Sequence, residues 1–323
     1  MEYKVNLLTK NYEALKKVKA ASWMGIILHG CALTYTLKDK EINVKLVNEC
    51  IDLIRDNTSI FSDFRGNSSV NTAIILSLQP NPKSSLEEIL EIHKKLKQNK
   101  FYSGDCLALV ANTIFENKNR INIDECIEKM KYIYESMRQN HPFLTSVDDY
   151  MSACTMAINS KNIEEDLKNM ENAYEYLNKN GFHRSNTLQS LAQILAYTHK
   201  KTAWDNCIHI KKELEIRKCK LHEFGYPLIG IIALLELNDV GYIIEKIKEL
   251  SNDLKQHKSY GNFSLGESYR NMICSIIVIS EYTKKLDINS FIINTIIDDI
   301  NQAMNIAIIT ATTSAIIINN SST

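Results

Sequence analysis

Adjacent carboxylates are the first residues of this 323-residue chain whose types and spacing could do chemistry. Paired acids such as Asp148 and Asp149 can bind Mg²⁺ or share a proton. On a helix, however, neighbouring residues point about 100° apart. Tyr150, Met151 and Ser152 follow where an aspartate-rich metal motif would carry more ligands. We therefore expect one carboxylate to cap a helix and the other to face solvent, and we predict no metal.

Cysteine and histidine lie near each other at three places: His29 with Cys31, Cys207 with His209, and Cys219 with His222. Each set supplies two ligands, whereas zinc sites use three or four protein ligands. The eight cysteines are otherwise spread singly without a C-x-x-C, which is typical of reduced thiols in a cytosolic protein. We expect core cysteines and surface histidines, and no cofactor.

Familiar catalytic motifs are absent from the chain. It contains no G-x-S-x-G, no G-x-G-x-x-G and no Walker-type loop. Nucleophilic and nucleotide-dependent catalysis therefore have no local motif.

Charge and hydropathy exclude two further classes of partner. The chain has 38 Lys+Arg against 38 Asp+Glu, so neutrality argues against nucleic acid or an anionic membrane surface. The most apolar stretch, 303–318, is too short and too polar to span a bilayer, and the polar start at 1–10 is unlike a signal peptide. We expect a cytoplasmic protein with no nucleic-acid and no membrane partner.

The elements that must position any site are repeats of about 40 residues. Polar segments end again and again in one large apolar residue, at intervals of 39 to 42 residues: Phe61, Phe101, Phe143, Phe182, Leu221 and Tyr260. A second series of helix N-caps has a similar interval: Asn43, Ser85, Asn122, Asn162, Thr202 and Asn238. Three of these carry a glutamate three residues on, as in a capping box: Ser85 with Glu88, Asn122 with Glu125 and Asn162 with Glu165.

Each repeat is predicted to be a helical hairpin. Its first helix has one apolar stripe and a solvent-exposed face of Lys, Glu and Asn. Its second helix is apolar on nearly every side and is therefore expected to be buried. Strand alternation is absent, so we predict an all-α single domain over 1–323 with about seven hairpins. It comprises a degenerate first unit (1–42), repeats (43–284) and a capping helix pair (285–318). Stacked hairpins form either an open α-solenoid or a curved or closed α/α toroid, and the sequence leaves both open.

Several phrases resemble one bacterial family, in the same order over nearly the whole chain. They are residues 64–67 (FRGN), 142–145 (PFLT) running into 148–150 (DDY), 183–192 (HRSNTLQSLA) and 225–228 (GYPL). The family is the Firmicute one catalogued as domain of unknown function 4003. The resemblance implies a cytosolic, single-domain bacterial protein and carries over no activity.

The same phrases lie at the turn that leads from the first helix of a repeat into the second. Equivalent turns of stacked repeats line up along one edge, so we expect their polar residues to form a rim, beside helix N-termini that favour anions. Capping is the competing role for many of them. The candidate ligand-binding residues are Arg65, Asn67, Asp105, Asp148, Asp149, His183, Arg184, Asn186, Gln189 and Tyr226.

Two functions are compatible with this pattern. The first is a helical-repeat scaffold that binds a peptide, a protein segment or a small polar ligand on its concave face and polar rim. The alternative is an enzyme of unknown reaction with its active site in the central cavity of a toroid, using Arg65, Asp148, Asp149, His183, Arg184 and Gln189. Catalytic residues and oligomeric state are not identified by the sequence.

Overall fold

The computed structural model describes residues 1–19, 25, 27–66, 68–140, 145–196, 201–221, 225–235 and 239–285, with Asp148, Lys284 and Lys285 described by backbone alone. Within these ranges the chain forms fourteen α-helices and no strand, which confirms the all-α prediction. The predicted capping pair at 285–318 lies outside the described residues except for Lys285, and the apolar stretch at 303–318 lies wholly outside them.

Long and short helices alternate along the chain. The long helices are α3 (Val44–Asn57), α5 (Pro82–Gln98), α7 (Ile123–Asn140), α9 (Ile163–Lys179), α11 (Lys201–Ile216) and α13 (Val240–Lys255). The short ones are α2 (Ile27–Leu37), α4 (Ser68–Ser77), α6 (Asp105–Asn117), α8 (Tyr150–Asn159), α10 (Asn186–Ala196) and α12 (Tyr226–Leu234). Helix α1 (Glu2–Leu15) opens the series, and α14 (Glu267–Lys285) is a longer second helix of the last described hairpin.

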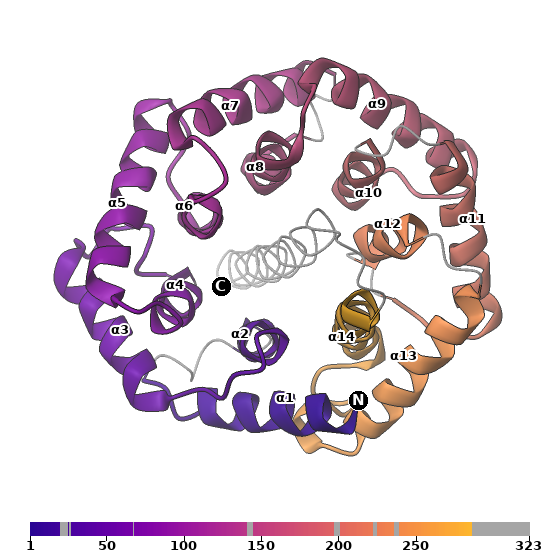
Figure 1. Cartoon of the computed structure of the whole chain (residues 1–323), viewed down its shortest axis with the longest axis horizontal. Helices are drawn as coiled ribbons and strands as arrows, with labels where there is room; N and C mark the ends of the chain where they lie inside the picture. Colours follow the sequence, from indigo (N-terminus) through magenta and orange to yellow (C-terminus); the bar gives the residue numbers. More distant parts are fainter. Residues whose placement is uncertain are drawn as a thin grey trace, which may run out of the picture. The chain divides into compact units, whose positions relative to one another are not determined.

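The described chain divides into two compact units. Unit 1 contains residues 1–9 and 159–285, and unit 2 contains residues 10–158. In unit 2, α3 packs on α4, α4 on α6 and α5 on α6; in unit 1, α9 packs on α10, α10 on α12 and α13 on α14. Within each unit the long helices form one layer and the short helices a second layer (Figure 1). The single domain remains a prediction.

Burial explains the difference between the two kinds of helix. Helix α7 buries one stripe, which contains Cys126, Ile127, Met130, Ile133 and Met137, and exposes most of its charged residues. Helix α4 buries every residue from Val70 to Ser77. Short helices that are buried on nearly every side confirm the predicted inner position of the second helix of each repeat.

Asparagine caps set the starts of the long helices. Asn43 Oδ1 accepts a hydrogen bond from the Leu46 amide at 3.2 Å, and Asn122 Oδ1 accepts one from the Glu125 amide at 3.1 Å. At α9, Asn162 Oδ1 accepts from the Glu165 amide at 3.4 Å, and the Asn162 side-chain Nδ2 donates to Glu165 Oε2 at 3.2 Å, so the two residues predicted to form a capping box are paired through their side chains.

Two of the other predicted caps are wrong, and one lies outside the described residues. Asn81, not Ser85, caps α5 through the Ser84 amide at 3.2 Å, because Pro82 occupies the first helical position, where its missing N–H costs nothing. Thr202 already lies inside α11. Asn238 is not described, and its neighbour Asp239 caps α13 through the Tyr242 amide at 2.9 Å.

The apolar residue that closes each repeat is also placed by the structure. Phe101, Phe182 and Tyr260 are buried as predicted, and Phe143 lies outside the described residues. Phe61 does not close its repeat, since its side chain is 89% exposed and Phe64 takes the buried position. The turn between α3 and α4 therefore carries an exposed segment ahead of its buried phenylalanine.

Candidate functional site

An Asp–His pair holds the turn after α3 against the long helix of the next repeat. His93, on α5, places Nε2 2.7 Å from Asp63 Oδ2, and each side chain is about a tenth exposed. The imidazole and the Phe64 ring pack edge to face, with centroids 5.1 Å apart. The pair therefore joins two consecutive repeats of unit 2.

The surroundings of Asp63 keep it ionised. Burial alone would raise the pKa of its carboxyl, but hydrogen bonds from His93 and from the Gly104 backbone, with the nearby charges of His93 and Lys97, bring that pKa below its usual range. A carboxylate on Nε2 orients the imidazole and leaves Nδ1 as the other reactive ring nitrogen.

The pair forms part of the wall of an open hollow of about 640 Å³ in unit 2. Its walls come from the end of α3, the turn that follows it, the second half of α5 and the turn after α5: Asn57, Thr58, Ser59, Phe61, Ser62, Asp63, Leu90, His93, Lys94, Lys97, Gln98 and Ser103. Ile60 and Phe61 are exposed beside it. The hollow thus lies at the predicted rim, where long helices turn into short ones.

Two lysines give the hollow its charge. Lys94 Nζ is 3.3 Å from Glu91 on the same exposed helix face. Lys97 forms no ion pair with any residue that the structure describes. Asp63 is the one carboxylate in the wall, and its oxygens already accept from His93 and Gly104.

Arg65 and Asp105, both predicted site residues, hold the turn between α3 and α4 through hydrogen bonds to the ends of these helices. Arg65 donates to the Thr58 hydroxyl at 2.9 Å, to the Thr58 carbonyl at 2.6 Å and to the Arg55 carbonyl, so it caps the C-terminus of α3. Asp105 Oδ1 accepts from the Ser68 amide at 3.1 Å and caps α4. A Cβ on Gly66 would lie 2.8 Å from this carboxylate oxygen, so the close approach requires glycine.

The remaining predicted residues of unit 2 are the two adjacent acids and Asn67. Asp149 lies in a 3₁₀ turn, η2 (Val147–Asp149), is buried, and accepts from the Ser146 amide at 2.8 Å. It holds its own turn, as the capping interpretation expects of one acid of the pair. Asn67 and the Asp148 side chain lie outside the described residues.

In unit 1 the predicted residues separate into a turn and a core. His183 and Arg184 are exposed, and Arg184 Nε donates to Asn178 Oδ1 at 3.2 Å. Asn186 begins α10, which Ser185 caps through the Leu188 amide at 3.1 Å. Gln189 is 1% exposed, in the buried layer, and its amide has no hydrogen-bond partner among the residues described.

Tyr226, the last predicted residue, starts α12. Its ring and that of Phe182 pack edge to face, with centroids 5.0 Å apart. This contact gives it a packing role at the closing residue of the preceding repeat.

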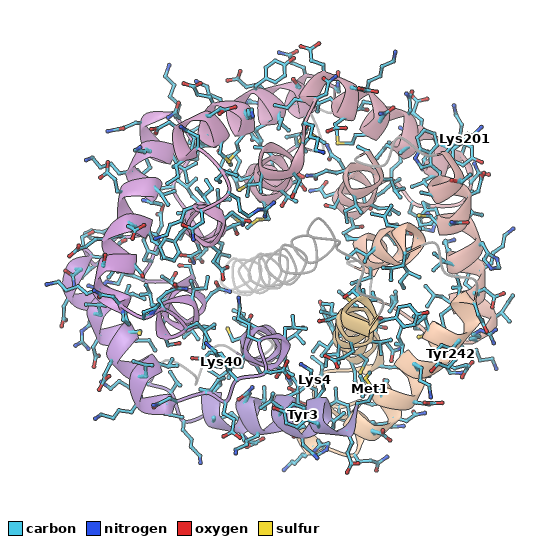
Figure 2. The ribbon with its side chains drawn as sticks, viewed as in Figure 1. Met1, Tyr3, Lys4, Lys40, Lys201 and Tyr242 are labelled. Atoms are coloured by element: carbon cyan, nitrogen blue, oxygen red, sulfur yellow. The ribbon has the colours of Figure 1, made fainter. Side chains whose placement is uncertain are left out.

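A smaller hollow of about 260 Å³ lies in unit 1, lined by Met1 and residues of α13 and α14. Lys4 is buried beside it, and its ammonium lies 3.4 Å from Glu281 Oε1. Figure 2 labels Met1, Lys4 and Tyr242 at this end of unit 1. The ion pair fixes the first turns of α1 against α14.

The cysteine and histidine predictions are confirmed in part. All eight cysteines are free and seven are buried. His29 is buried against Tyr12, with stacked rings 4.1 Å apart, so the expected surface position is wrong. His222 is outside the described residues, within which no three His, Cys, Asp or Glu side chains gather as a metal site. Nor is any helix of that part long and apolar enough to cross a membrane.

Asp63, His93 and Lys97 were missed by the sequence reasoning. Asp63 and His93 are 30 residues apart and form no motif. The available signal was the second phenylalanine of the turn. If Phe64 is the buried residue of the turn, residues 58–63 are expected on the surface beside the next long helix.

Comparison with known proteins gives one family and one relative. The family model described as "Protein of unknown function (DUF4003)" matches residues 11–314. A Bacillus subtilis (strain 168) protein named "Uncharacterized protein YeaA" is 22% identical over 232 residues, which cover 70% of this chain and 69% of the relative. No solved structure matches the chain.

Proposed function

We propose a binding function for this chain, which belongs to the family of proteins of unknown function described as DUF4003. In this proposal the helical repeats are a rigid scaffold, and the hollow of unit 2 receives a small polar ligand or the side chain of a peptide segment. The observation that carries it is the open hollow of about 640 Å³ with the Asp63–His93 pair in its wall.

Burial favours the turns over the helices as the binding surface. The short helices are buried on nearly every side, so few of their side chains are available to a ligand. The hollow instead exposes the hydroxyl of Ser59, the ring of Phe61 and the ammonium of Lys97 to solvent. Pockets with a few convergent polar groups are the usual form of a small-molecule site.

An enzyme is the second candidate, and the same pair supports it. A carboxylate that orients a histidine is the arrangement of a general base, with Nδ1 of His93 as the atom that would take a proton. Such a role requires a substrate hydroxyl or a water within hydrogen-bond reach of Nδ1. The enzyme candidate therefore shares its site with the binding candidate and differs only in turnover.

Ligand-observed saturation-transfer NMR tests the binding proposal. The probe is a mixture of phosphate esters, organic acids, amino acids, amines and neutral sugars, added to the full chain. Ser59→Trp fills the hollow from an exposed position, and Ser84→Trp places the same ring at the far end of α5 as the control. We expect at least one compound to receive saturation from the wild type and from Ser84→Trp but not from Ser59→Trp.

Two results would contradict the proposal. One is that no compound receives saturation, and the other is that the same compounds respond equally with all three proteins. New resonances that grow with time in the wild-type sample, and not with His93→Gln, would identify turnover and favour the enzyme.

A further inference from the structure

The charged groups around the hollow of unit 2 are two ammonium groups and one carboxylate. The ammonium groups belong to Lys94 and Lys97, and the other polar side chains that line the hollow can either donate or accept hydrogen bonds. Its single carboxylate, Asp63, already accepts two hydrogen bonds. A ligand that matches such a wall must bring acceptors, and charged acceptors make the strongest hydrogen bonds to ammonium groups.

From this excess of positive charge we propose that the hollow binds an oxyanion, a phosphate or carboxylate group, attached to an apolar group. The inference rests on the proposed binding function, because it names the class of ligand for the same hollow. Lys97 is its main charge, since this ammonium forms no ion pair among the described residues, whereas Lys94 already faces Glu91.

The C-terminus of α3 lies at the hollow, where its carbonyl groups would disfavour an anion unless they are capped. Carbonyl groups at a helix C-terminus carry partial negative charge and disfavour anions. Here the guanidinium of Arg65 donates to the carbonyls of Arg55 and Thr58 at that terminus. Asn57 also turns its amide back onto the Leu53 carbonyl at 2.8 Å. An anion in the hollow therefore meets capped carbonyls on this side and Lys97 on the other.

The apolar part of the ligand is inferred from the exposed phenylalanine. Phe61 is in the wall and 89% exposed, next to Ile60, while Leu90 contributes a half-buried aliphatic side chain. An exposed ring on a turn loses solvent-accessible area when an apolar group stacks on it, which is favourable. An oxyanion on Lys97 with its apolar group on Phe61 uses both features.

Titration of the full chain with phenyl phosphate, inorganic phosphate, benzoate and benzylammonium chloride tests the inference at low ionic strength and neutral pH. We expect phenyl phosphate and benzoate to bind, inorganic phosphate to bind more weakly, and benzylammonium not to bind. Lys97→Met should weaken phenyl phosphate roughly tenfold or more, as loss of a charged hydrogen bond does. Lys83→Met, an exposed lysine at the other end of α5, is the matched control and should change nothing.

Phe61→Ala separates the two parts of the ligand. It should weaken phenyl phosphate several-fold, because the ring of the ligand loses its stacking partner, and leave inorganic phosphate unchanged. Equal affinity of Lys97→Met and wild type for phenyl phosphate would overturn the inference, as would tighter binding of benzylammonium than of phenyl phosphate.

Failure of this inference is distinguishable from failure of the proposed function. If amines or neutral sugars alone give saturation transfer that Ser59→Trp abolishes, the hollow is a binding site and the ligand class is wrong. If no compound of either set binds, both are wrong.

Discussion

The turn after α13 and the turn after α3 have the same place in their repeats but use their charged residues differently. In unit 1, Arg270 on α14 is 2% exposed and donates to Ser251 Oγ at 3.0 Å, the Tyr260 carbonyl at 2.9 Å and Asn262 Oδ1 at 3.0 Å. In unit 2, Arg65 and Asp105 cap helices, while His93 and Lys97 face an open hollow.

The difference separates structural donors from available ones. The three groups that accept hydrogen bonds from Arg270 belong to its own hairpin, so its donors serve the turn. In unit 2 the turn is already held by Arg65 and Asp105, and further donors remain at its surface. A function is expected where donors exceed what the fold uses, and this points to the hollow.

The largest expected effect comes from removing the buried arginine. Arg270→Met leaves the acceptors on the buried residues Ser251 and Tyr260 without their donor. We expect the free energy of unfolding to fall by about 3 kcal/mol, measured by urea denaturation followed by circular dichroism. Arg184→Met, an exposed arginine of the same unit, should change it by no more than about 0.5 kcal/mol. Similar losses of unfolding free energy in both variants would contradict a structural role that is particular to Arg270.

The free energy of unfolding should fall in acid because of the buried His29 in unit 2. Burial lowers the pKa of this imidazole to about 3. The unfolded chain takes up the proton below about pH 6.5 and the folded chain does not, so stability falls as pH drops from 6.5 towards 3. Between pH 7.5 and 5.0 the expected loss is about 2 kcal/mol, from roughly 1.4 kcal/mol per pH unit.

His29→Phe provides the check, because it keeps a ring against Tyr12 and removes the titration. Urea denaturation at the two pH values should show a smaller loss in the variant than in the wild type. An equal loss in both proteins would show that His29 does not carry the acid sensitivity.

A smaller effect is expected from Asp63→Asn. The variant loses the charge-assisted hydrogen bonds to His93 and Gly104, and we expect a loss of about 1.5 kcal/mol at pH 7. Because the folded-state pKa of Asp63 is lowered, its contribution is present above about pH 4 and disappears as pH falls through that lower pKa. Wild type and variant should therefore converge in stability at the acid end of a pH series. A difference that stays constant to pH 2 would contradict this role.

The smallest expected loss of stability comes from the N-cap of α5, the helix that carries His93 and Lys97. Asn81→Ala removes the cap on the Ser84 amide and should cost about 1 kcal/mol. Ser85→Ala removes a hydroxyl from inside the helix and should cost clearly less. Thermal unfolding of the two variants compares them, and a larger loss for Ser85→Ala would contradict the observed start of α5.

The features that the sequence predicts correctly are those that depend on residues within one repeat. The apolar stripe of α7 and the asparagine caps of α3, α7 and α9 depend on residues three or four apart. It failed at Phe61 because Phe61 and Phe64 both satisfy a spacing of about 40 residues, and only packing shows which ring is buried.

The hollow lies at turns that the sequence analysis singled out, but the residues that form its Asp–His pair were not among the predicted ones. Arg65 and Asp105 hold the turn between α3 and α4, and capping and ligand binding favour the same residue types, so spacing alone does not tell the two roles apart. The Asp63–His93 pair depends on how the turn of one repeat meets the long helix of the next. That distance is set by the stacking of repeats, which sequence separation does not encode. A ligand role for the rim residues stays a prediction.

Methyl NMR of the full chain titrated with phenyl phosphate tests the central claim most directly, with isoleucine and leucine methyl groups labelled. The account predicts saturable shifts at Ile60 and Leu90, loss of those shifts in Lys97→Met, and no shift at Ile216, an exposed isoleucine of unit 1. Unchanged Ile60 and Leu90 signals, or shifts of equal size at Ile216, would contradict the assignment of the hollow as the binding site.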